Sequence, residues 1–283
     1  MADPAADAER LAEVALAEDG ARDLTTEVTA AADERLVGRI ELRTPAVVAG
    51  LAYAEAVAAR AGCGPIAWRV VEGERCDART VLGTFAGSAL AVLRAERPLL
   101  NLLQRASGIA TATRAYVDAV AGTGCRVLHT RKTAPGLRAL DVRAVLAGGG
   151  ALHRVDLADT VMIKDNHWQA LARAGRPLAD AVAEARRRGA RAVQVEVEHP
   201  AQLREACGAG ADRLLVDNQS AATLRAWAAE ARRLRPGIEI EATGGITLEN
   251  VRAYAEAGAD YVSIGALTHS VRAADVAVEV AAG

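Results

Sequence analysis

The sequence is poor in aromatic residues, which make up 3% of the chain and include a single phenylalanine. Proteins that bind single-stranded nucleic acid stack its bases on aromatic side chains, so this class of protein is disfavoured. A basic excess is missing as well, because 34 lysines and arginines stand against 36 acidic residues and leave a net charge of −2. Nucleic-acid-binding domains usually carry a strong positive charge, so any cationic patch here must be local.

Cysteines and long apolar runs are also few. The four cysteines lie far apart in the sequence, and no two of them have the spacing of a metal-binding pair. We expect them to be small buried side chains in a reducing compartment. The longest apolar stretch, residues 46–59, is interrupted by Glu55 and is too short to span a bilayer. The acidic N-terminus lacks the pattern of a signal peptide, so we predict a cytoplasmic protein.

The length of 283 residues, with 51% of them apolar, is sufficient for one or two domains with a large core. The first hundred residues mix helical and strand-like patterns and predict an α+β arrangement. The predicted helices are 5–18, 52–61 and 97–116, with Pro98 near the first turn of the last one, and the predicted short strands lie within 36–42, 66–71 and 81–93.

The second half of the chain alternates strands with helices. About seven strand-like runs follow residue 126, and most are separated by an amphipathic or alanine-rich segment. This alternation implies parallel strands joined by crossover helices. It favours a closed or open α/β barrel, and an open doubly wound sheet is the competing arrangement. The runs are 127–129, 151–153, 160–163, 192–197, 213–216, 238–241 and 261–264, and the clearest helices are 178–188 and 220–234.

Polar residues follow these apolar runs at the positions where the predicted strands end. In both arrangements ligands bind at the carboxyl ends of the strands, so these side chains are candidates for one site. The cationic residues come first in the chain, and acidic and glycine-containing positions follow. Such a site suits a poly-anionic substrate at one end and a hydrated metal ion at the other. The candidates are Arg131, Lys132, His153, Arg154, Lys164, Glu198, Asp217 and Thr243-Gly244-Gly245.

The cations can bind anions in different ways. Arg131 offers a planar fork for a carboxylate or phosphate, and Lys132 offers a point charge. A solvated basic turn is the alternative for this pair, and a packed histidine is the alternative for His153. Lys164 directly follows a predicted buried strand, so its ammonium group needs a partner, for which Asp165 and a bound anion are the candidates.

The carboxylates suggest a metal ion. Glu196 and Glu198 share one face of a predicted strand, and Asp217 follows the next strand along the chain. Inward-facing carboxylates at the mouth of a barrel suit a Mg²⁺ ion that keeps its waters and binds substrate phosphates. A salt bridge to a nearby arginine or lysine is an equally compatible alternative.

The last two predicted strands are followed by glycines. Thr243-Gly244-Gly245 comes after one of them, and Gly265 comes after the other. Backbone N–H groups in such turns can cradle a phosphate, and phosphate-binding barrels commonly use their last two loops in this way. Ordinary tight turns are the alternative interpretation.

Longer motifs run through nearly the whole chain. They are HTRKTAPGLR at 129–138, GGG at 148–150 followed by His153-Arg154, and IKDNH at 163–167, with EDG at 18–20, DLTT at 23–26, ER at 96–97, LLN at 99–101 and SGIAT at 107–111. Together these motifs resemble the quinolinate phosphoribosyltransferase family, the carboxylating nicotinate-nucleotide pyrophosphorylases of NAD biosynthesis. The Lys-Asp-Asn-His stretch is highly specific to that family.

The resemblance implies a reaction and an architecture. Quinolinate and phosphoribosyl pyrophosphate, with Mg²⁺, would give nicotinate mononucleotide, pyrophosphate and CO₂. An N-terminal α/β sandwich domain, 1–110, would be joined by the C-terminal tail, 268–283, and an open α/β barrel of about seven strands would occupy 111–267. The resemblance further implies a homodimer, which could assemble into a hexamer, with Arg97 of one subunit completing the site of the other.

The resemblance also assigns roles to the candidate residues. The two carboxylates of quinolinate would be neutralised by cationic side chains, while Lys132 would face phosphoribosyl pyrophosphate as a catalytic group. Glu198 and Asp217, also catalytic, would hold the ribose hydroxyls and the Mg²⁺ assembly. Their contact with the metal would be indirect, through the substrate pyrophosphate. The quinolinate-binding residues would be Arg131, His153, Arg154, Lys164 and the partner's Arg97, and the 5′-phosphate would lie on Thr243, Gly244, Gly245 and Gly265.

Two positions depart from the family pattern. Thr243 stands where a serine is usual, and Asp141-Val142-Arg143 replaces the usual Glu-Lys-Tyr. The competing functions are a molybdenum-associated accessory protein of the same fold, and another phosphate-binding barrel such as a lyase or isomerase. The Lys-Asp-Asn-His stretch argues against the accessory protein. The crowding of cations argues against a lyase or isomerase, which needs a general acid–base pair near the phosphate.

Overall fold

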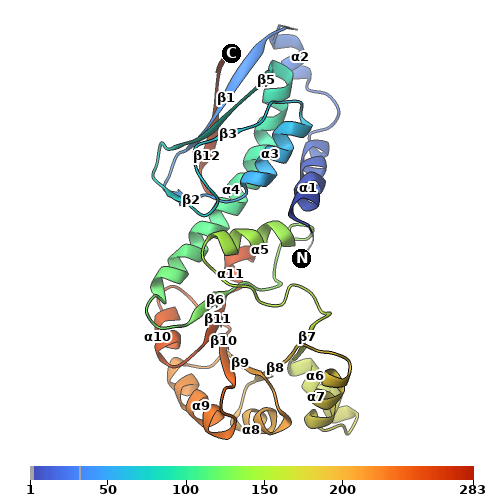
Figure 1. The fold of residues 1–283 in the computed structure, drawn as a ribbon, viewed down its shortest axis with the longest axis vertical. Helices are drawn as coiled ribbons and strands as arrows, with labels where there is room; N and C mark the ends of the chain where they lie inside the picture. The colour runs from blue at the N-terminus through green and yellow to red at the C-terminus, as the bar shows by residue number, and fades with distance from the viewer. Residues whose placement is uncertain (1–2, 32) are drawn as a thin grey trace. The chain divides into compact units, whose positions relative to one another are not determined.

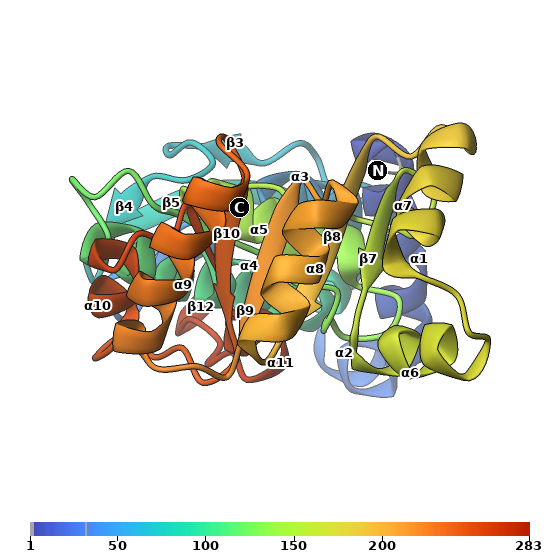
Figure 2. The same ribbon diagram turned by 90° about the horizontal axis from the view of Figure 1, so that it is seen from below.

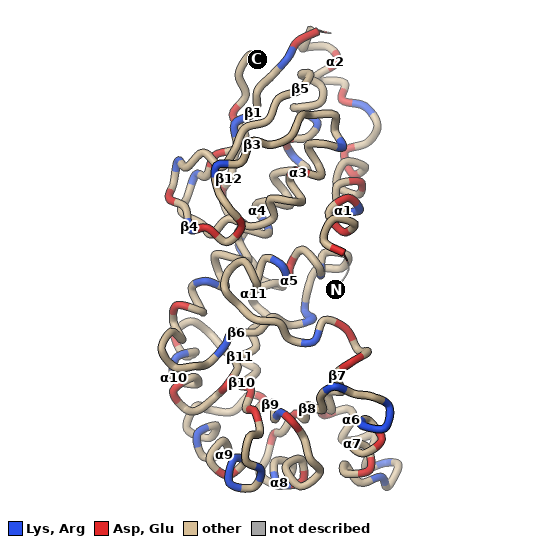
Figure 3. The backbone as a smooth tube through the Cα atoms, viewed as in Figure 1, with Lys and Arg blue, Asp and Glu red and all other residues tan. Residues whose placement is uncertain are grey.

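The structure is a computed structural model that describes residues 3–31 and 33–283. The chain divides into two compact units. Unit 1 contains the chain up to Arg114 together with residues 132–150 and 266–283, and unit 2 contains residues 115–131 and 151–265. Lys/Arg and Asp/Glu residues are interspersed along both units (Figure 3), as the small net charge of −2 leads one to expect.

Unit 1 is built on a four-stranded antiparallel sheet in the order β12-β1-β5-β3. Its central strand β1 alternates buried and more exposed residues, so that Leu36, Ile40 and Leu42 face the core. Strand β12 pairs along β1, and this pairing places the C-terminal tail in the sheet of unit 1 (Figure 1). The strands are β1 Arg35–Leu42, β3 Ala67–Trp68, β5 Val81–Ser88 and β12 Val276–Ala282, and a separate pair joins β2 Ala46–Val47 to β4 Arg75–Cys76.

The longest helix of the chain, α4, spans Ala89–Ala119. The prediction that 81–93 is strand-like is wrong for its last five residues, and the predicted helix start at residue 97 is eight residues too late. The reason is local: the Ser88 hydroxyl accepts a hydrogen bond from the Ala91 N–H at 3.2 Å, which begins the helix. Pro98 therefore lies inside the helix and not in its first turn. The remaining helices of unit 1 are α1 Pro4–Glu18, α2 Leu24–Thr29, α3 Leu51–Arg60, α5 Arg138–Ala147 and α11 Ala266–His269.

Residues 132–150, including helix α5, group with unit 1, although the predicted boundaries put them in the barrel domain 111–267. Buried contacts explain the difference. Asp141 on α5 is fully buried and forms two hydrogen bonds of 2.8 Å with Arg105 of α4. A Cβ atom at Gly148 would meet the Ala110 carbonyl oxygen at 2.5 Å, so the end of α5 lies directly against α4. Contacts of this kind depend on tertiary packing and leave no periodic signal in the sequence.

Unit 2 is built on a six-stranded parallel sheet in the order β6-β11-β10-β9-β8-β7. The neighbours run in chain order from β7 to β11, without the reversal that marks a doubly wound sheet, so the barrel-like α/β arrangement is confirmed. The predicted strand 151–153 is reduced to one bridge between Ala151 and Leu128, which leaves six strands instead of about seven. The strands are β6 Arg126–Leu128, β7 Thr160–Ile163, β8 Ala192–Val197, β9 Arg213–Asp217, β10 Glu239–Thr243 and β11 Tyr261–Ser263.

The helices of unit 2 lie along the outside of this curved sheet (Figures 1 and 2). Helix α9 illustrates the reason, because its buried residues Leu224, Trp227, Ala228 and Ala231 recur at helical spacing and form one apolar face. Within the described residues, no helix is long and apolar enough to cross a membrane. The helices are α6 Asp165–Arg173, α7 Leu178–Arg187, α8 Pro200–Ala209, α9 Ala221–Leu234 and α10 Val251–Glu256.

Candidate functional site

The carboxyl ends of the six parallel strands bring most of the predicted site residues to one edge of the sheet in unit 2. Lys164 directly follows β7 and Glu198 directly follows β8. Asp217 is the last residue of β9, and Thr243 is the last residue of β10. Arg131 follows β6 by three positions and Gly265 follows β11 by two. Because parallel strands end at a common edge, these side chains share one region of the fold.

One group at this edge is cationic. Arg154 is half-buried, and the pKa of its guanidinium is lowered by burial and by the positive charge of Arg131, against the opposing charge of Glu241. The His153 Nε2 atom lies 3.2 Å from the Glu241 Oε2 atom. The His153 ring also packs edge-to-face on His129, with 6.4 Å between the ring centroids. Arg154 also donates a hydrogen bond of 3.3 Å to the carbonyl of Thr160, the first residue of β7. We call Arg131, His153 and Arg154 the cationic group, in which His153 is charged only when protonated and two members, His153 and Arg154, interact with the buried carboxylate of Glu241.

That carboxylate, Glu241, is a residue that sequence reasoning missed. Its side chain is 1% exposed and accepts a hydrogen bond of 3.0 Å from Arg213, besides the contact with His153. Burial opposes ionisation, but hydrogen bonds and charges from His153, Arg213 and Ser263 outweigh it and lower the pKa of Glu241. The alternating run Ile238-Glu239-Ile240-Glu241 predicted a strand but did not single out its glutamates. Both lie on one face of β10, and Glu241, further inside the strand, is the one that is buried, while the Glu239 side chain is 42% exposed.

Lys164 forms an ion pair with Glu196 of the neighbouring strand β8. Of the two candidate partners, Asp165 is not used, because it is an exposed residue that begins helix α6, and a bound anion stays a prediction. The register explains the choice: Ile163 of β7 pairs with Val195 of β8, so the next residues along the two strands, Lys164 and Glu196, are neighbours. The Lys164 side chain is 41% exposed and that of Glu196 is 8% exposed, so the ammonium group remains accessible to a ligand.

The acidic residues form a second group around this ion pair. The pKa of Asp217 is raised by burial and by the negative charges of Glu196 and Glu198, whereas a hydrogen bond from Asn218 and the charge of Lys164 lower it. Three carboxylates thus stand near one lysine, and the surplus negative charge favours a cation or hydroxyl donors. Among the described residues, no three His, Cys, Asp or Glu side chains converge as a metal-binding group. Mg²⁺ therefore stays a prediction, and one that relies on the substrate, because Mg²⁺ is often bound by one or two carboxylates together with substrate phosphates.

The turn after β10, where the sequence predicts a phosphate site, is formed by two glycines. Gly244 and Gly245 both have positive φ angles, +80° and +61°. A Cβ atom at Gly244 would meet the Asn218 Oδ1 atom at 2.3 Å, so the Asn218 side chain would have to move, and the positive φ angle strains any residue other than glycine. Asn250 donates a hydrogen bond of 2.9 Å to the Gly245 carbonyl and fixes the turn from the other side. The loop is therefore closely packed and presents its backbone, and not side chains, at the strand end.

Replacement of Gly244 by alanine should damage this loop specifically. We expect the free energy of unfolding to fall by about 1–3 kcal/mol from backbone strain and the clash with Asn218. If the loop binds a phosphate, the KM for the phosphorylated substrate should rise while that for the other substrate stays within about twofold. Gly175→Ala is the matched control, because Gly175 also has a positive φ angle but has no atom within 4 Å of the added Cβ. Equal kinetic effects of the two substitutions would contradict the prediction.

Two predicted site residues belong to unit 1, and their roles stay predictions. Arg97 lies on α4 with a side chain that is 60% exposed, 4.0 Å from Glu96. Lys132 is exposed, and its carbonyl oxygen accepts a hydrogen bond of 2.9 Å from the Thr268 hydroxyl.

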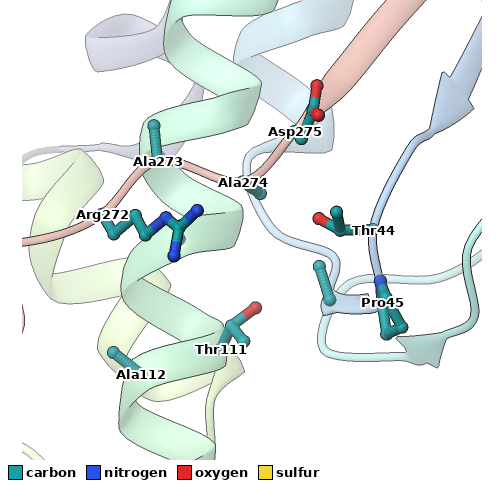
Figure 4. A pocket seen from close by; sticks show the side chains of 10 residues that line it. Thr44, Pro45, Thr111, Ala112, Arg272, Ala273, Ala274 and Asp275 are labelled. Carbon is teal, nitrogen blue, oxygen red and sulfur yellow. The ribbon is translucent and has the colours of Figure 1, made fainter.

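A pocket of about 400 Å³ in unit 1 is shown in Figure 4. It is lined by Thr44 and Pro45, by residues of α4 including Thr111, and by the segment from Arg272 to Asp275. The Thr111 hydroxyl already has two partners within the protein, since it accepts a hydrogen bond from the Val47 N–H and donates one to the Ser107 carbonyl. The ten residues around this pocket include none of the predicted site residues, so it is distinct from the edge of the unit 2 sheet.

A parallel α/β sheet with cations, carboxylates and a glycine turn at its strand ends, combined with a separate antiparallel domain, defines a class of enzyme that binds anionic and phosphorylated substrates. Comparison with known proteins identifies the family. The chain matches the model of the quinolinate phosphoribosyl transferase C-terminal domain over residues 109–279 and that of the N-terminal domain over residues 23–107. The chain therefore belongs to the quinolinate phosphoribosyltransferase family.

Individual relatives agree with this assignment. The nicotinate-nucleotide pyrophosphorylase [carboxylating] of Mycobacterium leprae is 39% identical over 91% of this chain and 90% of that protein. The probable enzyme of the same name from Bacillus subtilis is 44% identical over 74% of this chain and 71% of that protein. The solved structure of the nicotinate-nucleotide pyrophosphorylase from Francisella tularensis superposes with a TM-score of 0.90 at 30% identity, and covers 99% of this chain and 98% of that one.

Proposed function

We infer that the protein transfers the phosphoribosyl group of phosphoribosyl pyrophosphate to quinolinate and releases CO₂, which gives nicotinate mononucleotide and pyrophosphate for NAD biosynthesis. The observation that carries this inference is the set of potentially cationic side chains around the parallel sheet in a member of this family: Arg131 and Lys164 follow β6 and β7, and Arg154, which comes directly after His153, interacts with the charge of Arg131. Four potentially cationic side chains match a substrate with two carboxylates. No comparable observation favours the molybdenum-associated accessory protein, or a lyase or isomerase.

In this proposal the cationic group binds the two carboxylates of quinolinate. Arg131 and Arg154 provide planar forks that suit bidentate contacts with a carboxylate. His153 is held by Glu241 through its Nε2 atom, so its Nδ1 atom is left for the substrate. Lys164, anchored on Glu196, supplies a further cation from the next strand. The mutual repulsion of Arg131 and Arg154 is relieved when a dianion binds between them, which favours a diacid over a monoacid.

The acidic group and the glycine turn bind phosphoribosyl pyrophosphate in the same proposal. Glu198 and Asp217 accept hydrogen bonds from the ribose hydroxyls and hold Mg²⁺, directly or through water, and Lys132 neutralises the pyrophosphate. Mg²⁺, when bound, neutralises charge on the departing pyrophosphate. The 5′-phosphate rests on the backbone amides of the turns after β10 and β11, and the side chain that helps there is the Thr243 hydroxyl. The residues assigned to this phosphate are Thr243, Gly244, Gly245 and Gly265.

The chemistry then needs positioning and charge stabilisation, without a covalent enzyme intermediate. The ring nitrogen of quinolinate forms a bond to the anomeric carbon as the bond from that carbon to the pyrophosphate oxygen breaks. The ring is then cationic, so it accepts the electron pair left when the adjacent carboxylate departs as CO₂. A proton takes the place of that carboxylate. The side chains around the ring hold it in place and stabilise the charges that develop.

The direct test is incubation with quinolinate labelled in the carboxylate next to the ring nitrogen, together with phosphoribosyl pyrophosphate and Mg²⁺. We expect labelled CO₂, pyrophosphate and nicotinate mononucleotide in equal amounts. Removal of Mg²⁺ with a chelator should stop all three products together. If properly folded protein forms no nicotinate mononucleotide, the proposed function is wrong. A cytoplasmic location belongs to the same proposal and is supported by the four free cysteines, which are typical of a reducing compartment.

We further propose that the active form is a homodimer, or a hexamer made of three such dimers, in which Arg97 completes the site of the partner subunit. Its exposed position on α4 leaves it free to reach another chain. Mixing Arg97→Ala subunits with Lys164→Ala subunits should then restore about a quarter of wild-type activity, because half of the dimers are mixed and each has one intact site. Mixing Arg131→Ala with Lys164→Ala subunits is the control and should restore nothing, because both residues come from the same chain. Equal recovery in the two mixtures would contradict the shared site.

A further inference from the structure

The segment Lys132–Gly136 has neither helix nor strand, yet side chains from three different helices hold its backbone. The Thr268 hydroxyl of α11 donates to the Lys132 carbonyl at 2.9 Å. The Asp141 carboxylate of α5 accepts from the Ala134 N–H at 3.3 Å. Arg10 of α1 donates to the Gly136 carbonyl at 2.7 Å. A loop of five residues is thus fixed at its first, third and fifth positions.

These contacts are connected by a buried ion pair. Asp141 is fully buried and accepts both hydrogen bonds from the Arg105 fork at 2.8 Å. The Arg105 guanidinium also donates to the Thr268 carbonyl at 3.1 Å. Thr268 therefore receives a hydrogen bond through its backbone and gives one through its side chain. One continuous chain of hydrogen bonds therefore runs from Asp141 through Arg105 and Thr268 to the Lys132 carbonyl, and each member restricts the position of the next.

The burial of this network makes it rigid. Thr268 is 1% exposed, so water does not replace its hydroxyl when the bond to Lys132 is lost. The Asp141 carboxylate has satisfied partners only while Arg105 and the Ala134 N–H keep their present geometry. The backbone at Lys132 consequently has little freedom, although its side chain is exposed.

We propose that Thr268, supported by the Asp141–Arg105 pair, is a positioning residue that fixes the backbone of Lys132 for the transfer reaction. This inference rests on the proposed function, in which the Lys132 ammonium meets phosphoribosyl pyrophosphate. Lysine has a long and flexible side chain, so the reach of its ammonium depends on where the backbone holds its Cα atom. A displacement of about 1 Å in a group that stabilises the transition state can lower the rate about a hundredfold.

Thr268→Val tests the proposal, because it removes the hydroxyl and keeps the shape of the side chain. We expect kcat to fall about tenfold to a hundredfold, with the KM for quinolinate within about twofold of wild type. Thr268→Ser keeps the hydroxyl and should restore kcat to within about threefold of wild type. This split between kcat and KM, with rescue by serine, is not expected of a residue that only supports the fold.

The matched control is Thr113→Val. Thr113 is also fully buried, and its hydroxyl donates a hydrogen bond of 2.8 Å to the Ile109 carbonyl within α4, so this bond is not one of those that hold the Lys132–Gly136 backbone. Both valine variants lose one buried hydrogen bond, so their unfolding midpoints should fall by similar amounts. Only Thr268→Val should lose turnover. Equal kcat values for the two folded variants would overturn the proposal.

A measurement on the wild-type protein separates this proposal from the proposed function and does not depend on a variant that folds. Hydrogen exchange, read by NMR, should show the Ala134 amide strongly protected, since it donates to a buried carboxylate. Thr268→Val should raise its exchange rate at least tenfold, and Thr113→Val should not. If the wild-type amide exchanges as fast as in an unstructured loop, the positioning network does not exist. This result can be read even if no nicotinate mononucleotide is formed.

Discussion

Replacement of Lys164 by alanine is expected to lower kcat/KM for quinolinate about a hundredfold to a thousandfold. The substitution removes a cation next to a substrate carboxylate, and loss of one stabilising group of this kind typically has such an effect. It also leaves the Glu196 carboxylate, which is 8% exposed, without its partner. An uncompensated anion in the site repels an anionic substrate, so KM and kcat should both deteriorate. Steady-state rates of nicotinate mononucleotide formation at several quinolinate concentrations provide the measurement.

The control for Lys164 is Arg191→Ala, which removes one cation from the opposite end of the same sheet. Arg191 immediately precedes β8, is 77% exposed and pairs with Asp159 at 3.3 Å. Exposed ion pairs of this kind contribute little to the stability of the fold, and Arg191 is not among the predicted site residues. Activity should therefore stay within about twofold of wild type. If Lys164→Ala kept wild-type kcat/KM, or if both variants lost activity equally, the assignment of Lys164 to the quinolinate site would be wrong.

Replacement of Glu241 by glutamine is expected to lower the free energy of unfolding by about 3 kcal/mol at pH 7. The substitution removes the buried charge that compensates Arg213, whose side chain is only 12% exposed, and that holds His153. Arg213 keeps its second partner, Glu239, at 2.7 Å, which limits the loss. Urea unfolding of the two proteins under the same conditions measures the difference. Glu239→Gln, at a residue that is 42% exposed, is the control and should have a much smaller effect.

The effect of Glu241 on stability should depend on pH in a defined direction. Its pKa is lowered in the folded protein, whereas an unperturbed glutamate has a pKa of about 4.3. The charged carboxylate therefore contributes its full stability above about pH 4.3, and the contribution is lost as the pH falls through the lower folded pKa. The difference between wild type and Glu241→Gln should thus be constant from about pH 7 to pH 5 and should shrink below about pH 4. If the difference in free energy of unfolding between the two proteins is unchanged down to pH 3, the charged form of Glu241 does not stabilise the fold as stated here.

Periodicity in the sequence was enough to predict most of the barrel. Short apolar runs at 160–163 and 192–197 became β7 and β8 with the same limits, because each is a buried strand bounded by polar residues. The shorter run 151–153, which has no β-branched residue, forms only one bridge. A three-residue run carries no information about whether a partner strand is available along its length. Helix α4 began earlier than predicted because 89–93 is apolar enough for either structure and only the Ser88 cap decides it.

The positions of the candidate residues at strand ends were predictable from the sequence, but their pairings were not. Lys164, Glu198 and Asp217 lie at the ends of β7, β8 and β9 as expected, since that inference needs only the limits of the strands, and their roles in a site stay predictions. The partner of Lys164 depends on the register between β7 and β8, which no local pattern determines. Glu241 and Arg213 were missed because their burial and pairing follow from the packing of the folded sheet, which local sequence patterns also do not determine.

A crystal structure of the protein with phthalate, an unreactive aromatic diacid, tests the central claim most directly. The account predicts that phthalate binds at the carboxyl ends of the parallel strands, with its two carboxylates within hydrogen-bond distance of Arg131, His153, Arg154 or Lys164. The ring should lie beside the Glu198 and Asp217 carboxylates, which belong to the other substrate. Phthalate bound elsewhere, with these four side chains turned away from it toward solvent, would contradict the account.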